Sequence, residues 1–74
     1  MLNDTERQEQ IRKRLVESIK QSGLTQTAIA KQAGLSVSML TDYKNRGKMP
    51  SVVTLAKLCE VLDISADEIL GHKK

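Results

Sequence analysis

Apolar residues in the first third of the chain recur at the spacing of an amphipathic helix. The stripe consists of Ile11, Leu15, Val16 and Ile19. A repeat of about four residues puts these side chains on one face, so the pattern predicts a helix with one buried side. Thr5 is its expected N-cap, and Gly23 lies just beyond its expected end.

Four further helices are predicted, and each follows a hydroxyl residue that can cap its first turn. Their spans are 26–33, 37–45, 52–62 and 66–70, and their caps are Thr25, Ser36, Ser51 and Ser65. The expected inner side of the fourth helix is Val52, Leu55, Leu58, Cys59 and Leu62. No segment alternates apolar and polar residues over the length of a strand, so the predicted fold class is all-α.

The second and third predicted helices have a demanding spacing. Two helices that cross steeply after a short turn need a small residue where their backbones approach, and Ala30 supplies it. Gly34 can take the positive φ that the turn requires, and Leu35 follows as an apolar plug. Leu40 and Tyr43 then anchor the third helix on the core. Its other face has no core role and carries Val37, Ser38, Thr41, Asp42 and Asn45.

A chain of 74 residues is expected to form one domain, residues 1–74 with a core over 5–70. The only cysteine, Cys59, excludes an internal disulfide and is expected to be an inert core residue. No apolar run is long enough to span a membrane and the N-terminus is not signal-like, so the expected protein is soluble and cytoplasmic.

Charge is distributed unevenly along the chain. Residues 24–48 carry four bases against one acid, for +3, whereas residues 49–70 carry one base against four acids, for −3. The bases Lys44, Arg46 and Lys48 gather in residues 44–48, called the basic turn below. This part of the chain is the candidate surface for a polyanion, although a solvated charged face would give the same pattern.

The sequence offers nothing for catalysis. His72 lies in a charged tail without a partner at catalytic or metal-binding spacing, and no nucleophile elbow, phosphate loop or carboxylate pair is present. We therefore predict no catalytic residue, no metal, no cofactor and no evident small-molecule site.

The stretch LTQTAIAKQAGLSVSMLTDYKNRGKMPSVVTLAKLCEVLDISADEIL, about residues 24–70, resembles the Cro/phage-repressor type of helix-turn-helix domain, the xenobiotic-response-element group. The resemblance implies a compact five-helix bundle in which helices 2 and 3 form the helix-turn-helix and the third reads DNA. It implies that Gln26 touches a phosphate, that Val37, Ser38 and Asp42 face base edges, and that Asn45 and its basic neighbours grip the backbone. Many members have Glu where Lys44 stands and Gln or Arg where Val37 stands.

The expected base-reading residues are Val37, Ser38, Thr41 and Asp42, and the expected phosphate contacts are Gln26, Ser36, Lys44, Asn45, Arg46 and Lys48. Ser36 is a helix cap first. Val37 can contact a thymine methyl or remain a leftover apolar patch, and Met39 can do the same or pack partly on the core. Asp42 can accept a bond from cytosine, but orienting Arg46 is the favoured role.

We therefore expect a sequence-specific regulator that binds a double-stranded DNA operator, a repressor, acting as a homodimer on two half-sites. The resemblance suggests a dimer surface around residues 64–70. The rival hypothesis is a protein-interaction module, such as an antitoxin or an adaptor, with the same fold. The chain could also be the N-terminal part of a longer repressor.

Overall fold

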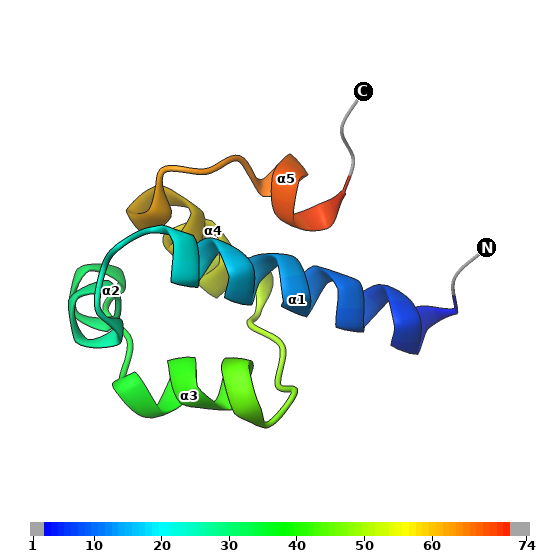
Figure 1. Ribbon diagram of the computed structural model, residues 1–74, viewed down its shortest axis with the longest axis horizontal. Coiled ribbons are helices and arrows are strands. Elements are labelled where there is room, and N and C mark those ends of the chain that lie inside the picture. Colours follow the sequence, from blue (N-terminus) through cyan, green and yellow to red (C-terminus); the bar gives the residue numbers. More distant parts are fainter. Residues whose placement is uncertain (1–2, 72–74) are drawn as a thin grey trace.

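Five helices form in the computed structural model, which describes residues 3–71 (Figure 1). They are α1 (Asp4–Gln21), α2 (Gln26–Ala33), α3 (Val37–Asn45), α4 (Val52–Leu62) and α5 (Ala66–Leu70). No strand occurs within this range, so the predicted all-α fold with five helices is confirmed. The predicted tail residue His72 lies outside the described residues.

The N-cap of α1 differs from the prediction. Asn3, not Thr5, precedes the helix, and its side-chain oxygen accepts the main-chain N–H of Glu6 at 2.8 Å. Its amide nitrogen donates in return to the Glu6 carboxylate at 2.9 Å. Asn is a stronger N-cap than Thr. A helix that begins after Asn3 is also longer than one that begins after Thr5, so more main-chain groups form hydrogen bonds within it. The Thr5 prediction is wrong for that reason.

One residue of each helix is buried completely. These five residues are Leu15, Ile29, Leu40, Leu58 and Ile69. Around them lie smaller or less deeply buried side chains, among them Ala30, Ala33, Tyr43 and Cys59. All five helices therefore meet in one core, and removing any of these residues would open a cavity between several helices.

Val52 does not lie on the inner side of α4, and that prediction is wrong. Its side chain is 85% exposed and that of Val53 is 65% exposed, whereas Leu58, Cys59 and Leu62 are buried. Leu55 packs against the core from the second turn of the helix. Val52 opens the helix, and the first turn of α4 lies beyond the edge of the core.

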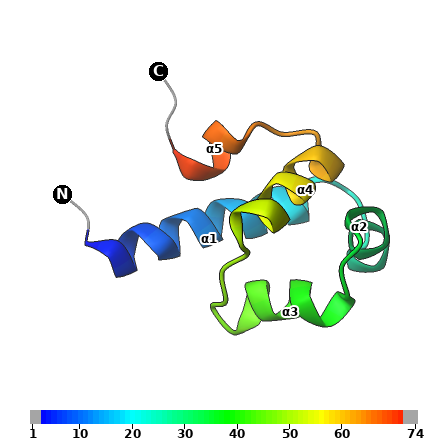
Figure 2. The ribbon, with the colours of Figure 1, turned by 180° about the vertical axis from the view of Figure 1, so that it is seen from behind.

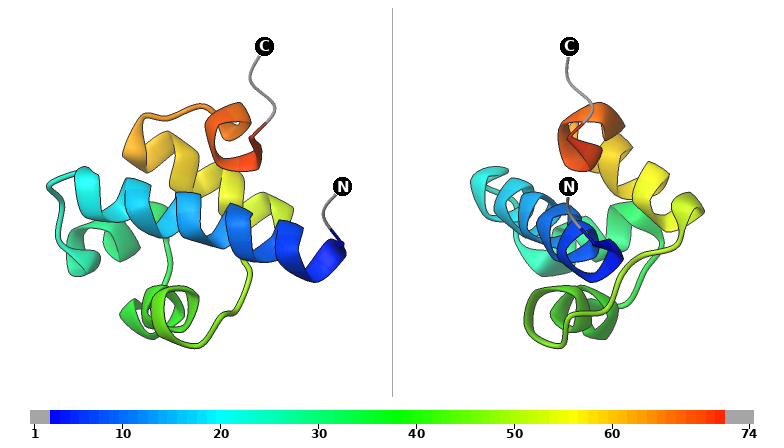
Figure 3. Two further views of the ribbon diagram at one scale, coloured as in Figure 1. Left: turned by 45° about the vertical axis from the view of Figure 1, so that its right-hand side comes forward. Right: turned by 90° about the vertical axis from the view of Figure 1, so that its right-hand side faces the viewer.

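The long helix α1 runs through the middle of the molecule. α3 lies on one side of it and α5 on the other, as Figures 1 and 3 show. Seen from behind in Figure 2, α4 crosses α1 and α2 lies beside the end of both. Contacts between α1 and α3, between α2 and α3 and between α2 and α4 hold this arrangement. One side of α3 packs on the bundle through Leu40 and Tyr43, and the other side is exposed to solvent.

The helices α2 and α4 end in the same way. In each, a residue with positive φ follows the last turn: Gly34 at 70° and Asp63 at 55°. The next residue then donates its N–H to the carbonyl five positions earlier, from Leu35 to Ala30 at 2.8 Å and from Ile64 to Cys59 at 3.0 Å. This is a Schellman ending, in which glycine adopts the left-handed conformation without a Cβ penalty.

Replacing Asp63 by glycine is expected to stabilise the protein by about 1 kcal/mol. The glycine removes the strain of a left-handed aspartate, and it removes a negative charge from the negative end of the α4 dipole. Urea unfolding followed by circular dichroism measures the change. Asp63→Asn is the matched control, because it removes only the charge and should raise stability by a few tenths of a kcal/mol. Equal stability of the two variants would contradict the backbone explanation.

Candidate nucleic-acid interface

A three-residue turn, residues 34–36, joins α2 to α3. Thr25 caps α2 by accepting the N–H of Ala28 at 3.1 Å, and Ser36 caps α3 by accepting that of Met39 at 3.3 Å. Figure 1 shows α2 nearly end-on and α3 from the side, so the two axes cross steeply. The capped ends and the left-handed Gly34 turn fix α3 on α2 as the spacing predicted.

The four predicted base-reading residues share one face of α3. Together with Arg46 they line an open hollow of about 290 Å³, the α3 hollow, whose lining is Val37, Ser38, Thr41, Asp42 and Arg46. The opposite face of the helix carries Leu40 and Tyr43, both buried. Burial also raises the pKa of the Tyr43 phenol, and the nearby Asp42 carboxylate raises it further. α3 thus presents an unpartnered polar and apolar surface to solvent while its other side belongs to the core.

The hydroxyls of this face are not equally free to act. Thr41 donates its Oγ1–H to the carbonyl of Val37 at 3.1 Å, so the same oxygen can still accept a bond but has committed its proton. Ser38 is exposed. Met39 is 36% exposed and is not among the residues of the buried core. Ser38 is therefore the side chain on this face best placed to give or accept a new hydrogen bond.

Asp42 holds the basic turn. Its carboxylate lies 3.5 Å from Nε of Arg46 and 3.8 Å from Nζ of Lys48. Its carbonyl accepts the main-chain N–H groups of the same two residues, at 2.9 and 3.3 Å. The Asp42 side chain is only 23% exposed, whereas those of Arg46 and Lys48 are 74% and 67% exposed. One acidic residue thus gathers two cations at the rim of the α3 hollow without burying them.

The predicted phosphate contacts surround this face at different places. Arg46 and Lys48 lie at the rim beside Asp42, and Asn45 ends α3 as an exposed residue. Ser36 is exposed at the other end of the helix. Gln26 opens α2 and does not line the α3 hollow. The geometry brings the predicted base-reading residues together and spreads the predicted phosphate contacts over the two ends of α3 and the start of α2.

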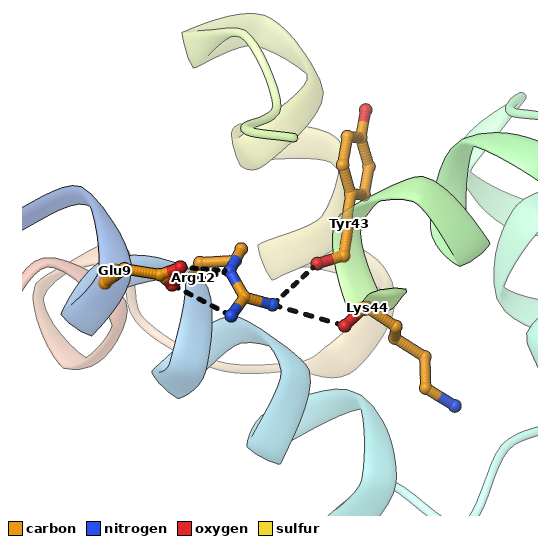
Figure 4. A network of polar contacts seen from close by, with 4 residues as sticks. All are labelled: Glu9, Arg12, Tyr43 and Lys44. Carbon is orange, nitrogen blue, oxygen red and sulfur yellow. Dashed lines mark hydrogen bonds and ion pairs between the residues drawn. The ribbon is translucent and has the colours of Figure 1, made fainter. Parts of the chain in front are cut away.

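Arg12 is a residue that the sequence reasoning missed. From α1 its Nη1 donates to the carbonyls of Tyr43 and Lys44, at 3.1 and 3.2 Å, as Figure 4 shows. Glu9 holds the rest of the guanidinium, and the side-chain hydrogen bonds from Arg12 lower the pKa of that carboxyl. Residues 12 and 43 are 31 positions apart and the acceptors are main-chain atoms, so no local pattern signals the contact.

Sequence comparison agrees with this geometry. A family model described as helix-turn-helix matches residues 15–69. The chain belongs to the Cro/C1-type helix-turn-helix family. It is similar to the uncharacterized HTH-type transcriptional regulator YazB of Bacillus subtilis, with 38% identity over 55 residues that cover 74% of this chain and 80% of YazB.

A second relative of this helix-turn-helix chain is the cryptic phage CTXphi transcriptional repressor RstR of Vibrio cholerae. The two are 31% identical over 62 residues, which cover 84% of this chain and 55% of RstR. The chain therefore spans about half the length of that repressor. No solved structure matches the chain significantly. The resemblance seen in the segment after residue 24 is confirmed at the level of the family.

Other kinds of site find little support in the helix-turn-helix domain. Within residues 3–71, no three His, Cys, Asp or Glu side chains are grouped so as to hold a metal ion. Cys59 is buried, and this burial raises the pKa of its thiol. No helix in the described range has both the length and the apolar character needed to cross a membrane.

Proposed function

We propose that this chain binds double-stranded DNA in a sequence-specific manner as a transcriptional regulator, and that it acts as a repressor. The observation that carries the proposal is the two-sided character of α3. One side is anchored in the core by Leu40 and Tyr43, and the other lines the open α3 hollow next to the basic turn. The names of YazB and RstR, a regulator and a repressor, support the same conclusion.

In this proposal α3 enters the major groove, which is wide enough to admit an α-helix and presents a distinct pattern for each base pair. Ser38 and Thr41 reach base edges, and Val37 contacts the methyl group of a thymine. These side chains are short, so specificity rests on a few close contacts. Affinity comes mostly from the cations beside them, since phosphate contacts position a protein on the duplex without reading its sequence.

Asp42 has the role of orienting those cations. A carboxylate close to DNA is repelled by phosphates, yet here it lies within ion-pair distance of both Arg46 and Lys48. It reduces the freedom of two long side chains before they meet the backbone, and so lowers the cost of ordering them. Lys44, Asn45, Arg46 and Lys48 then contact phosphates on one side of the groove, and Gln26 and Ser36 do so on the other.

A single domain of this size reads few base pairs, so we propose that it binds as a homodimer on two half-sites about one helical turn apart. The region around residues 64–70 is the proposed dimer surface. Ile64 is partly buried there and Leu70 is 37% exposed, which leaves apolar area available at the surface.

The test has two steps. Binding to random duplex DNA should weaken steeply as salt rises, with a slope of about 0.9 log unit of affinity per log unit of salt for each phosphate contacted. Selection of bound sequences from a random pool should then yield two related half-sites in inverted order. No binding to any duplex at low salt would contradict the proposal and favour a protein-interaction module. A single unrepeated site would contradict the dimer alone.

A further inference from the structure

The carbonyl groups at the C-terminal end of α3 accept hydrogen bonds from outside the helix. The last four carbonyls of an α-helix find no N–H donor within the helix itself. The Asp42 carbonyl accepts two main-chain N–H groups of the basic turn, at 2.9 and 3.3 Å. The next two, of Tyr43 and Lys44, accept Nη1 of Arg12 from α1. The main chain just after α3 therefore donates to the first of these carbonyls, and Arg12 of the distant helix α1 donates to the next two.

The direction of the Arg12 guanidinium is fixed before it reaches α3. Its Nε lies 3.2 and 3.0 Å from the two carboxylate oxygens of Glu9, and its Nη2 lies 2.8 Å from one of them. The group is planar and its five N–H bonds have fixed directions, so this pairing aims Nη1 at the end of α3, as Figure 4 shows. The Arg12 side chain is 19% exposed, which limits its alternative positions.

We propose that Arg12 is a positioning residue for base recognition: it fixes the tilt and rotation of the C-terminal half of α3 relative to the bundle. The inference rests on the proposed function, because it assigns a role toward the same DNA site. Arg12 does not line the α3 hollow and acts only through main-chain atoms of α3. Thr41 and Asp42 stand on the half of the helix that it holds, so a small rotation there moves both relative to the base edges.

Arg14 provides a matched control on the same helix. Its Nη1 donates to the carbonyl of Ile69 at 3.4 Å, near the end of α5, and its Nη2 donates to Gln10 at 3.2 Å. Arg12→Met and Arg14→Met each remove one positive charge and one arginine that serves a helix end, while the aliphatic part of each side chain is kept. The two variants differ in which helix is released.

The experiment measures discrimination within one half-site. Duplexes carrying the selected site are compared with duplexes in which a single base pair of each half-site is changed, for both variants and the parent protein. Arg12→Met should reduce this discrimination about tenfold, the value of roughly one good base contact. Arg14→Met should leave it unchanged, even if altered dimerisation weakens every site alike. The loss of general charge attraction to random duplex should be the same in both variants, because each removes one positive charge.

Equal discrimination by the two variants would overturn the proposal, as would a uniform loss on all duplexes in Arg12→Met, because either result describes a stabilising contact alone. A parent protein that binds no duplex would instead contradict the proposed function, and the positioning role would fall with it. Circular dichroism at the assay temperature reports whether each variant is folded.

Two milder substitutions cover the case in which Arg12→Met is unfolded. Glu9→Gln keeps the arginine but weakens the group that aims it, and Arg12→Lys keeps the charge at the end of α3 but cannot bind Glu9 and both carbonyls at once. Each should reduce discrimination by an intermediate factor of about three. Full discrimination in both would overturn the proposal.

Discussion

Replacing Leu40 by alanine is expected to lower the free energy of unfolding by about 3 kcal/mol. Leu40 is fully buried and, with Tyr43, anchors α3 in the core shared by all five helices. The truncation removes apolar contact and leaves a cavity that the surrounding helices fill only in part. A domain of 74 residues has about 4–11 kcal/mol of stability to lose, so a large fraction of the total would disappear.

Urea unfolding of Leu40→Ala, followed by circular dichroism, gives this value directly. Met39→Ala is the control, since Met39 precedes Leu40 in the same helix but is 36% exposed and lies outside the buried core. That change should cost about 0.5 kcal/mol or less. If Leu40→Ala cost no more than Met39→Ala, α3 would not be anchored through this residue.

The second large effect concerns affinity for DNA. The triple variant Lys44→Gln, Arg46→Gln and Lys48→Gln should bind every duplex more weakly at moderate salt, by about 100-fold for each protomer bound, because each missing cation weakens binding by about 1 kcal/mol. The slope of log affinity against log salt should fall by about 0.9 for each phosphate that is no longer neutralised, or about 2.7 for each protomer. Asp42 would then face the backbone without its two partners, which adds repulsion to this effect.

A matched triple variant separates the basic turn from general charge attraction. Lys13→Gln, Lys20→Gln and Lys57→Gln remove the same three charges from exposed positions on α1 and α4. This control should keep most of the salt slope and most of the affinity. Salt titrations on the same duplex compare the two. Equal losses of affinity would show that net charge drives binding and would contradict a specific role for residues 44–48.

These two predictions concern the two opposite sides of α3. Leu40 and Tyr43 commit one side of the helix to the core, so the other side can carry side chains with no structural duty. The basic turn follows directly and is gathered by Asp42 from the last turns of the helix. We therefore expect stability to depend on the core side of α3 and DNA affinity to depend on residues 44–48, so that substitutions separate the two.

Much of the fold could be predicted because its signals are local. A hydroxyl cap acts on an N–H two or three residues later, and Gly34 adopts its left-handed conformation within the turn itself. The bounds of α2 through α5 follow from such short-range effects. The pairing of Asp42 with Arg46 is also local, because residues four apart meet on one helix face. The grouping of the predicted base-reading residues on one face follows from the same helical spacing.

Two errors show where local reasoning stops. Two residues near the N-terminus, Asn3 and Thr5, could both cap α1, and the choice depends on which start pairs more of the helix. Val52 has the spacing of an inner residue, but burial depends on how far the core extends along α4. The spacing of apolar residues shows which face of a helix is turned toward the core. It does not show how far along the helix the neighbouring helices extend.

The sequence by itself determined the five helices, the caps of α2 to α5, the helix-turn-helix spacing and the face of α3 that is left without a core role. Only the tertiary structure decided what holds that helix in place. Arg12 reaches carbonyls more than thirty residues away, and Lys48 returns to Asp42 through a turn whose path the spacing does not specify. The physical reason is that every α-helix ends in the same free main-chain carbonyls, whatever its sequence. Which side chain donates a hydrogen bond to them depends on how the helices pack.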